Sequence, residues 1–130
     1  MGISIQTPGV HHITLRVSDF ERSKQFYTRT LGLPVAVETD DLCVVLAGNT
    51  ALGLRAPVDT TARGGSFDPC RVGLDHVALA CGSEAELERV AGALKEAGVE
   101  NTGVKLDPTL GKKYVAFKDP DRIAWEFYMA

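Results

Sequence analysis

The sequence predicts an α+β fold in which two β-α-β-β-β modules form one curved, mixed, eight-stranded sheet with a concave cleft. Two observations support this prediction: the halves of the chain repeat each other, and each half opens with an alternating strand followed by a helix-start signal. We assign the modules to residues 9–56 and 73–129 and the linker to residues 57–72. Together they make residues 1–130 a single domain.

The opening strand of each module is predicted from strict alternation. Residues 12–17 alternate between an apolar set and a polar set that begins with His12. In residues 76–81 large apolar residues and Cys81 alternate with His76 and two alanines, and His76 stands where His12 stands in the first module. The apolar sets should pack on a helix, which sends both histidines to the opposite, concave face.

A helix is predicted after each of these strands. Both strands run into Ser-x-x-Glu, beginning at Ser18 and Ser83, which is the pattern of a capping box. Gly32 and Gly98 follow the two apolar stripes and should end the helices. Three strands are then expected in each module, over residues 34–39, 42–47 and 51–56 and over residues 99–104, 113–118 and 123–128.

Composition narrows the class of protein. The 130 residues contain 14 Lys and Arg against 17 Asp and Glu, a net charge of −3, so no nucleic-acid partner is expected. No apolar stretch approaches the roughly 20 residues that a membrane-spanning helix needs, so no membrane span is expected. Three cysteines without a Cys-x-x-Cys pair, and no secretion signal, favour a reduced cytoplasmic protein.

A candidate metal site follows from strand parity. In the last strand the apolar set includes Trp125, so Glu126 should point to the concave face that His12 and His76 share. Two imidazoles and a carboxylate suit Fe, Mn, Zn or Ni and leave coordination positions open. A lone strand histidine is usually structural, but two of the three histidines here occupy equivalent repeat positions. His11 has the opposite parity and is expected to be a neighbour of the ligand.

The chain resembles the vicinal oxygen chelate superfamily, which includes glyoxalases, bleomycin resistance proteins and extradiol dioxygenases. The resemblance runs from Val10 to Tyr128 and is carried by three stretches: Val10-His11-His12-Ile13-Thr14-Leu15, Leu74-Asp75-His76-Val77-Ala78, and Phe117-Lys118-Asp119-Pro120-Asp121 with Glu126-Phe127-Tyr128. It implies a glyoxalase-like fold, a homodimer, and a divalent ion (Fe, Mn, Ni, Zn or Co) held by His12, His76 and Glu126. Thr14, Tyr114 and Tyr128 are the expected substrate-binding residues.

Departures from the family pattern limit the choice of activity. Glyoxalase I and methylmalonyl-CoA epimerase take a fourth ligand in the first module, at the position that is Gly53 here. Extradiol dioxygenases place a tyrosine where this chain has Ala116, and they need a further catalytic histidine. Arg122 replaces the usual glycine of the Asp-Pro-Asp-Gly turn, which predicts a turn without a positive φ at that position.

Two functions remain open at this point. The first is a metal-dependent enzyme that binds a small substrate through adjacent oxygens and acts as a lyase, isomerase, transferase or dioxygenase. The second is a non-catalytic protein that sequesters a drug or antibiotic, as bleomycin resistance proteins do, with Tyr114 and Tyr128 shaping an aromatic pocket. The sequence does not identify the substrate, the metal, the general acid or base, or the arrangement of the dimer.

Overall fold

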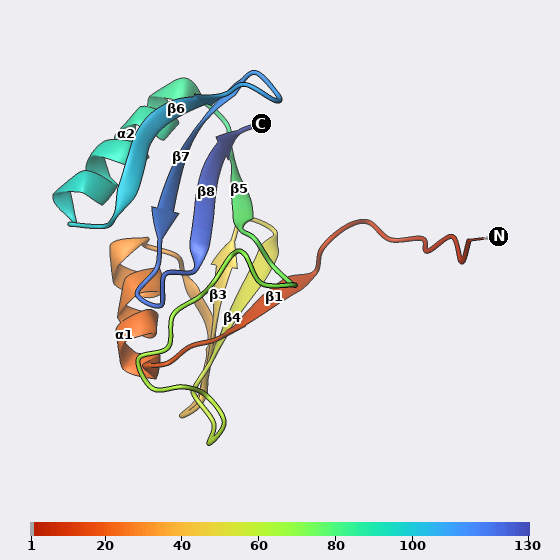
Figure 1. The fold of residues 1–130 in the computed structure, drawn as a ribbon, viewed down its shortest axis with the longest axis vertical. Coiled ribbons are helices and arrows are strands. Elements are labelled where there is room, and N and C mark those ends of the chain that lie inside the picture. The colour runs from red at the N-terminus through yellow and green to blue at the C-terminus, as the bar shows by residue number, and fades with distance from the viewer. Residues whose placement is uncertain (1) are drawn as a thin grey trace.

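The computed structural model describes residues 2–130 and contains two four-stranded sheets, each with helical structure from its own module. The first module holds β1 (His12–Arg16), α1 (Phe20–Gln25), the π-helical turn η1 (Phe26–Thr30), β2 (Val35–Glu38), β3 (Leu42–Ala47) and β4 (Thr50–Arg55). The second holds β5 (Val77–Cys81), α2 (Glu84–Glu96), β6 (Asn101–Asp107), β7 (Lys112–Lys118) and β8 (Ala124–Met129). The predicted β-α-β-β-β repeat is confirmed (Figure 1).

The sheets have the same topology but do not merge. The strand orders are β1-β4-β3-β2 and β5-β8-β7-β6, with the first pair parallel in each and the others antiparallel. The expected single eight-stranded sheet is therefore replaced by two sheets of four strands. Alternation within a strand fixes which side is buried, but it carries no information about how two sheets join at their edges.

The core lies where the apolar strand sets meet the helices. Leu15, Val17, Val115 and Trp125 are buried, whereas His12 and Thr14, of opposite parity on β1, are exposed. Additional buried core residues are Phe26, Tyr27, Cys43, Val45, Leu52, Leu54, Cys81, Leu87, Leu94, Phe117 and Ile123. Burial of these side chains supplies the main stabilisation and confirms the predicted strand parity.

The two helix starts differ from each other. Ser83 caps α2 as predicted, because its hydroxyl oxygen accepts a hydrogen bond from the Glu86 backbone N–H at 3.1 Å. The prediction that Ser18 caps the first helix is wrong: Asp19 is the cap and accepts from the Arg22 N–H at 3.1 Å. Ser18 instead donates its backbone N–H to the carboxylate of Asp121 at 2.9 Å.

The modules are joined by a buried polar contact. The Tyr27 hydroxyl, at the start of η1, donates to Asp119 Oδ2 at 2.6 Å and accepts from the Trp125 indole N–H at 2.9 Å. Both partners belong to the second module, so this contact ties the first helix to the turn that leads into β8. Burial raises the pKa of the Asp119 carboxyl, and the hydrogen bond from Tyr27 opposes that rise.

The turn between β7 and β8 contradicts the expectation for Arg122. Its φ is 65°, so a non-glycine residue occupies the left-handed region that glycine normally fills. The Arg122 N–H donates to Asp119 O at 2.9 Å, and its guanidinium pairs with Glu100 at 2.7 Å. The turn thus has a positive φ without a glycine, because surrounding contacts hold the arginine there.

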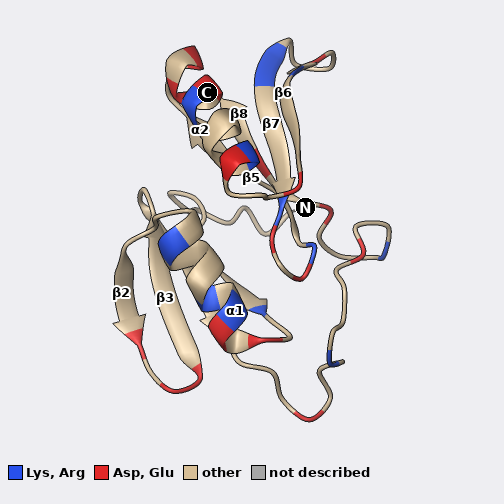
Figure 2. Cartoon of the chain, turned by 90° about the vertical axis from the view of Figure 1, so that its left-hand side faces the viewer, with Lys and Arg blue, Asp and Glu red and all other residues tan. Residues whose placement is uncertain are grey.

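The remaining segments are simpler. The linker, residues 57–72, contains no helix or strand and is anchored where the Phe67 N–H donates to Asp121 O at 2.8 Å. Both helices carry acidic residues in the first turn and a basic residue in the last turn (Figure 2). Among residues 2–130, no helix combines the length and the apolar character needed to cross a membrane. Cys43 and Cys81 are buried and Cys70 is exposed, all three as free thiols.

Candidate metal centre

The candidate site lies on the side of the second sheet that faces away from α2, called here the second open face. The register places Ala78 and Ala116 on either side of Glu126, and Tyr114 beside Tyr128. Because side chains alternate along a strand, Glu126 and Tyr128 project from β8 to this face while Trp125 projects to the core. The two alanines leave the Glu126 carboxylate without large neighbours across the strands.

His76 and Glu126 come together on this face. His76 stands just before β5, and its Nε2 lies 3.3 Å from Glu126 Oε1. Its other ring nitrogen, Nδ1, lies 2.7 Å from Asp75 Oδ1. The carboxylate of Asp75 accepts a hydrogen bond from Nδ1–H, so in the neutral ring the lone pair resides on Nε2, which points toward Glu126.

The electrostatics of His76 follow from these neighbours. The hydrogen bond to Asp75 raises the pKa of the imidazole, the Glu126 carboxylate adds to the rise, and burial opposes it. The His76 side chain is 43% exposed and that of Glu126 is 21% exposed. The pair is therefore sheltered but reachable, as a metal site with open coordination positions requires.

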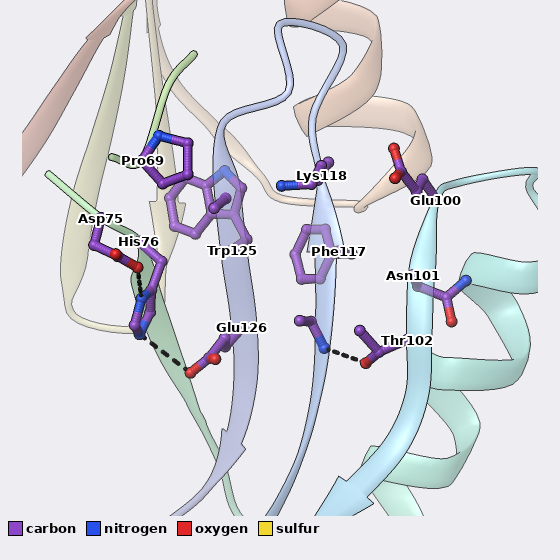
Figure 3. A pocket seen from close by; sticks show the side chains of 12 residues that line it. Pro69, Asp75, His76, Glu100, Asn101, Thr102, Phe117, Lys118, Trp125 and Glu126 are labelled. Carbon is purple, nitrogen blue, oxygen red and sulfur yellow. Dashed lines mark hydrogen bonds and ion pairs between the residues drawn. The ribbon is translucent and has the colours of Figure 1, made fainter. Parts of the chain in front are cut away.

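The pair opens into a cavity of about 310 Å³ that belongs to the second module and the end of the linker. Figure 3 shows His76 and Glu126 on one side of it, with Thr102 and Asn101 of β6 across the sheet. Such a volume lies at the small end of the range for ligand pockets. The cavity suits a substrate of a few carbon atoms better than a drug-sized molecule.

The first module repeats the arrangement in part. His12 opens β1, and its Nδ1 lies 2.8 Å from Nδ1 of His11, the residue before it. In both modules the preceding residue thus engages Nδ1 of the candidate ligand and leaves Nε2 for another partner. This geometry agrees with the expectation that His11 neighbours the ligand.

Register also locates the missing fourth ligand. Thr14 pairs with Gly53 across β1 and β4, as Ala78 pairs with Glu126 across β5 and β8. Gly53 is therefore the structural equivalent of Glu126. A Cβ atom at Gly53 would lie 3.0 Å from Thr14 Oγ1, so the glycine leaves room for the threonine side chain. Position 53 therefore offers no side-chain ligand, and His12 is the expected ligand of the first module.

Within one chain the three expected ligands do not meet. Residues 2–130 contain no group of three His, Cys, Asp or Glu side chains placed to hold a metal ion. The structure unites His76 and Glu126, and it leaves His12 exposed against His11. The donor set that is present, one imidazole nitrogen and one carboxylate oxygen, fits a divalent transition-metal ion that lacks one further protein ligand.

The expected substrate-binding residues divide between the two sheets. Tyr114 and Tyr128 stack on the second open face with ring centroids 5.9 Å apart, and the Tyr128 hydroxyl donates to Asp107 Oδ2 at 2.7 Å. Burial, with the hydrogen bond to Asp107, raises the pKa of Tyr128 to about 12, so the phenol stays neutral at pH 7. Thr14 lies on the first sheet beside Gly53 and does not line the cavity.

Sequence reasoning missed Lys118 as a residue of this site. It pairs with Ala124 across β7 and β8, shares the parity of Ala116, and lines the cavity. The same alternation that selected Glu126 would have found it.

Comparison with known proteins agrees with this architecture. A family model described as Glyoxalase/Bleomycin resistance protein/Dioxygenase superfamily matches residues 9–127. The chain belongs to this superfamily. The uncharacterized protein YwkD of Bacillus subtilis (strain 168) is 34% identical over 126 residues, which cover 92% of this chain and 94% of YwkD.

Solved structures share the fold of this chain. The glyoxalase/bleomycin resistance protein/dioxygenase domain from Frankia sp. EAN1pec superposes with a TM-score of 0.81 at 28% identity, covering 96% of this chain and 99% of that one. The structure of SMU.1112c gives a TM-score of 0.81 at 27% identity, covering 95% and 99% of the two chains. The glyoxalase-like fold expected from the sequence is thereby confirmed.

Proposed function

We propose that this superfamily member is an enzyme that uses a divalent metal ion to bind a small substrate through adjacent oxygens. The observation that carries the proposal is the convergence of His76 Nε2 and Glu126 Oε1, 3.3 Å apart, beside a cavity of about 310 Å³. The ion (Fe, Mn, Ni, Zn or Co) would be held by these two side chains and by His12. When bound, such an ion polarises substrate oxygens or binds them together with dioxygen.

A second copy of the chain supplies His12 in this proposal. In one chain His12 stands apart from the His76–Glu126 pair, yet all three side chains lie on open sheet faces. β1 and β5 are edge strands, so each presents an unpaired edge to a partner. A two-fold homodimer would bring His12 of each copy to the His76 and Glu126 of the other, making two equivalent sites.

The chain's own residues have distinct roles around this ion. Asp75 fixes the tautomer and the orientation of His76, which keeps Nε2 available. The ion binds the neutral His76 imidazole, whereas Asp75 favours the protonated imidazole. Occupancy of the site by the metal ion should therefore rise with pH. Thr14 of the partner copy, two residues beyond its His12, and the Tyr128 hydroxyl are proposed to contact the part of the substrate that extends beyond the cavity.

Sequestration of an aromatic compound is the second candidate function. The stacked Tyr114–Tyr128 pair, with centroids 5.9 Å apart on the second open face, is the observation that favours it. Under this alternative the aromatic pair would carry the binding. A bleomycin-type drug would then be held with full affinity by His12→Ala and His76→Ala variants.

Metal analysis tests the enzyme proposal. Protein purified without a nickel column is incubated with Fe, Mn, Ni, Zn and Co ions in turn. The wild type should retain about one equivalent of at least one ion, and His76→Ala and Glu126→Gln should retain less than about a tenth. Glu100→Gln is the matched control, because Glu100 lines the same cavity but pairs with Arg122 at 2.7 Å, and it should bind like the wild type. Equal retention by all four proteins would refute the site.

A further inference from the structure

Lys118 is a charged residue of the cavity that the proposed metal site does not use. It ends β7, pairs with Ala124 of β8 and projects to the second open face, where Ala116 and Glu126 also lie. Its side chain is half-buried rather than solvated. A lysine held over two alanines presents its amine to the cavity with no large side chain between them.

The carboxylates of the cavity are already engaged by other groups. Glu100 pairs with the Arg122 guanidinium at 2.7 Å, and Asp75 with His76 at 2.7 Å. Glu126 faces His76 Nε2 at 3.3 Å. In Figure 3 the Lys118 side chain points from β7 toward Pro69 and away from Glu100. Lys118 adds a smaller electrostatic attraction to Glu100, whose hydrogen-bonded partner is Arg122, so the lysine charge can still face a ligand in the cavity.

The separation between Lys118 and Glu126 sets the size of that ligand. The two residues are diagonal neighbours on β7 and β8, since Lys118 pairs with Ala124 and Ala116 with Glu126. Diagonal neighbours of this kind lie about 7–8 Å apart at the backbone. A molecule that chelates an ion held by His76 and Glu126 would thus reach the lysine amine with a group at the end of a short carbon chain.

We propose that the substrate is a small organic anion whose carboxylate, remote from the chelating oxygens, binds Lys118. This inference rests on the proposed function, in which the chelating oxygens of the substrate bind the ion held by His76 and Glu126. Lys118 acts as a specificity-determining residue: its half-buried ammonium forms a charge-assisted hydrogen bond with a carboxylate, which a substrate without that charge cannot offer. Substrates of the same length without the remote charge are selected against.

Two probe acids of equal chain length test the inference. 2-Oxoglutarate carries adjacent oxygens at one end and a carboxylate at the other, and 2-oxopentanoate lacks only the second carboxylate. Their dissociation constants are measured by calorimetry on the full chain, with Mn²⁺ and without it. The wild type should prefer 2-oxoglutarate by about tenfold, the discrimination expected for one charge-assisted contact.

Variants assign that preference to Lys118. Lys118→Met should bring the ratio of the two dissociation constants to within about twofold of one, and Lys118→Arg should keep most of the preference. Lys113→Met is the matched control, because Lys113 lies on the same strand with the opposite parity and pairs with Glu84 at 3.4 Å. It removes the same charge from the protein and should leave the ratio unchanged.

The outcomes separate this inference from the proposed function. A ratio near one in the wild type, with and without Mn²⁺, overturns the role of Lys118. A preference lost equally in Lys113→Met and Lys118→Met also overturns it, because the effect is then one of net charge. A preference for 2-oxoglutarate with no gain in affinity for either acid on adding Mn²⁺ supports the lysine subsite and counts against the metal site.

Discussion

Replacing Tyr27 by phenylalanine tests the contact that joins the two modules. The change keeps the ring, which packs against Phe26 and Trp125 with centroids 5.1 and 6.0 Å away. It removes the hydroxyl that donates to Asp119 at 2.6 Å and accepts from Trp125 at 2.9 Å. The Asp119 carboxylate oxygen Oδ2 and the Trp125 indole N–H, both buried, therefore lose their shared partner.

The magnitude follows from those two atoms. A buried polar group left without its partner costs about 1–3 kcal/mol, so the pair predicts a loss of about 3 kcal/mol in the free energy of unfolding. For a domain of this size that corresponds to a fall of roughly 10 °C in melting temperature. Tyr128→Phe is the control, because its hydrogen bond to Asp107 is only partly buried and the loss should stay under about 1 kcal/mol.

Urea unfolding followed by tryptophan fluorescence measures both variants. The pH dependence gives a second check, because the Tyr27 hydroxyl lowers the pKa of Asp119 against the rise caused by burial. Without the hydroxyl the folded-state pKa rises further, so the penalty is full where Asp119 is ionised and shrinks as the pH falls through that value. A loss below about 1 kcal/mol at pH 7 would refute this account of the contact.

Two further predictions concern the backbone. Arg122→Gly should be more stable than Arg122→Ala by about 1 kcal/mol, because both variants lose the ion pair with Glu100 but only alanine keeps the strain of a φ of 65°. Chemical denaturation measures the order of the two stabilities. A more stable alanine variant would contradict the prediction. Ser83→Ala should cost about 1 kcal/mol through loss of the 3.1 Å cap to Glu86 N–H, whereas Ser83→Asp should restore it; equal stability of the two variants would mean that the cap contributes little.

Strand parity made much of the site predictable. Alternation is a local property, so it correctly placed Glu126 and Trp125 on different faces of the sheet. It also correctly separated Thr14 from the core. The same rule applied evenly would have included Lys118, which shares a face with Ala116. The alternation pattern therefore contains both the carboxylate and the cation of the cavity.

Contacts between distant segments were the part that local patterns could not reveal. Ser18 was expected to cap a helix, but Asp121, 103 residues away, takes its backbone N–H. Arg122 adopts a left-handed φ because of contacts to Asp119 and Glu100 that its own dipeptide does not encode. The separation of His12 from His76 depends on how two sheets pack, which no single strand specifies.

The central claim is that His12, His76 and Glu126 hold one divalent ion, with His12 contributed by a second copy. Mixing His12→Ala with His76→Ala tests it most directly. Each variant alone lacks one ligand at both sites of its homodimer. When equal amounts are unfolded in urea and refolded together, half of the dimers are mixed, and each mixed dimer regains one complete site.

Metal bound per chain is then the deciding measurement. The account predicts near-background occupancy for each variant alone and about a quarter of the wild-type occupancy for the refolded mixture. Wild-type protein taken through the same unfolding and refolding is the reference. Occupancy of the mixture that stays at background while the refolded wild type binds fully would contradict a site shared between copies, and full occupancy of either variant alone would contradict the ligand set itself.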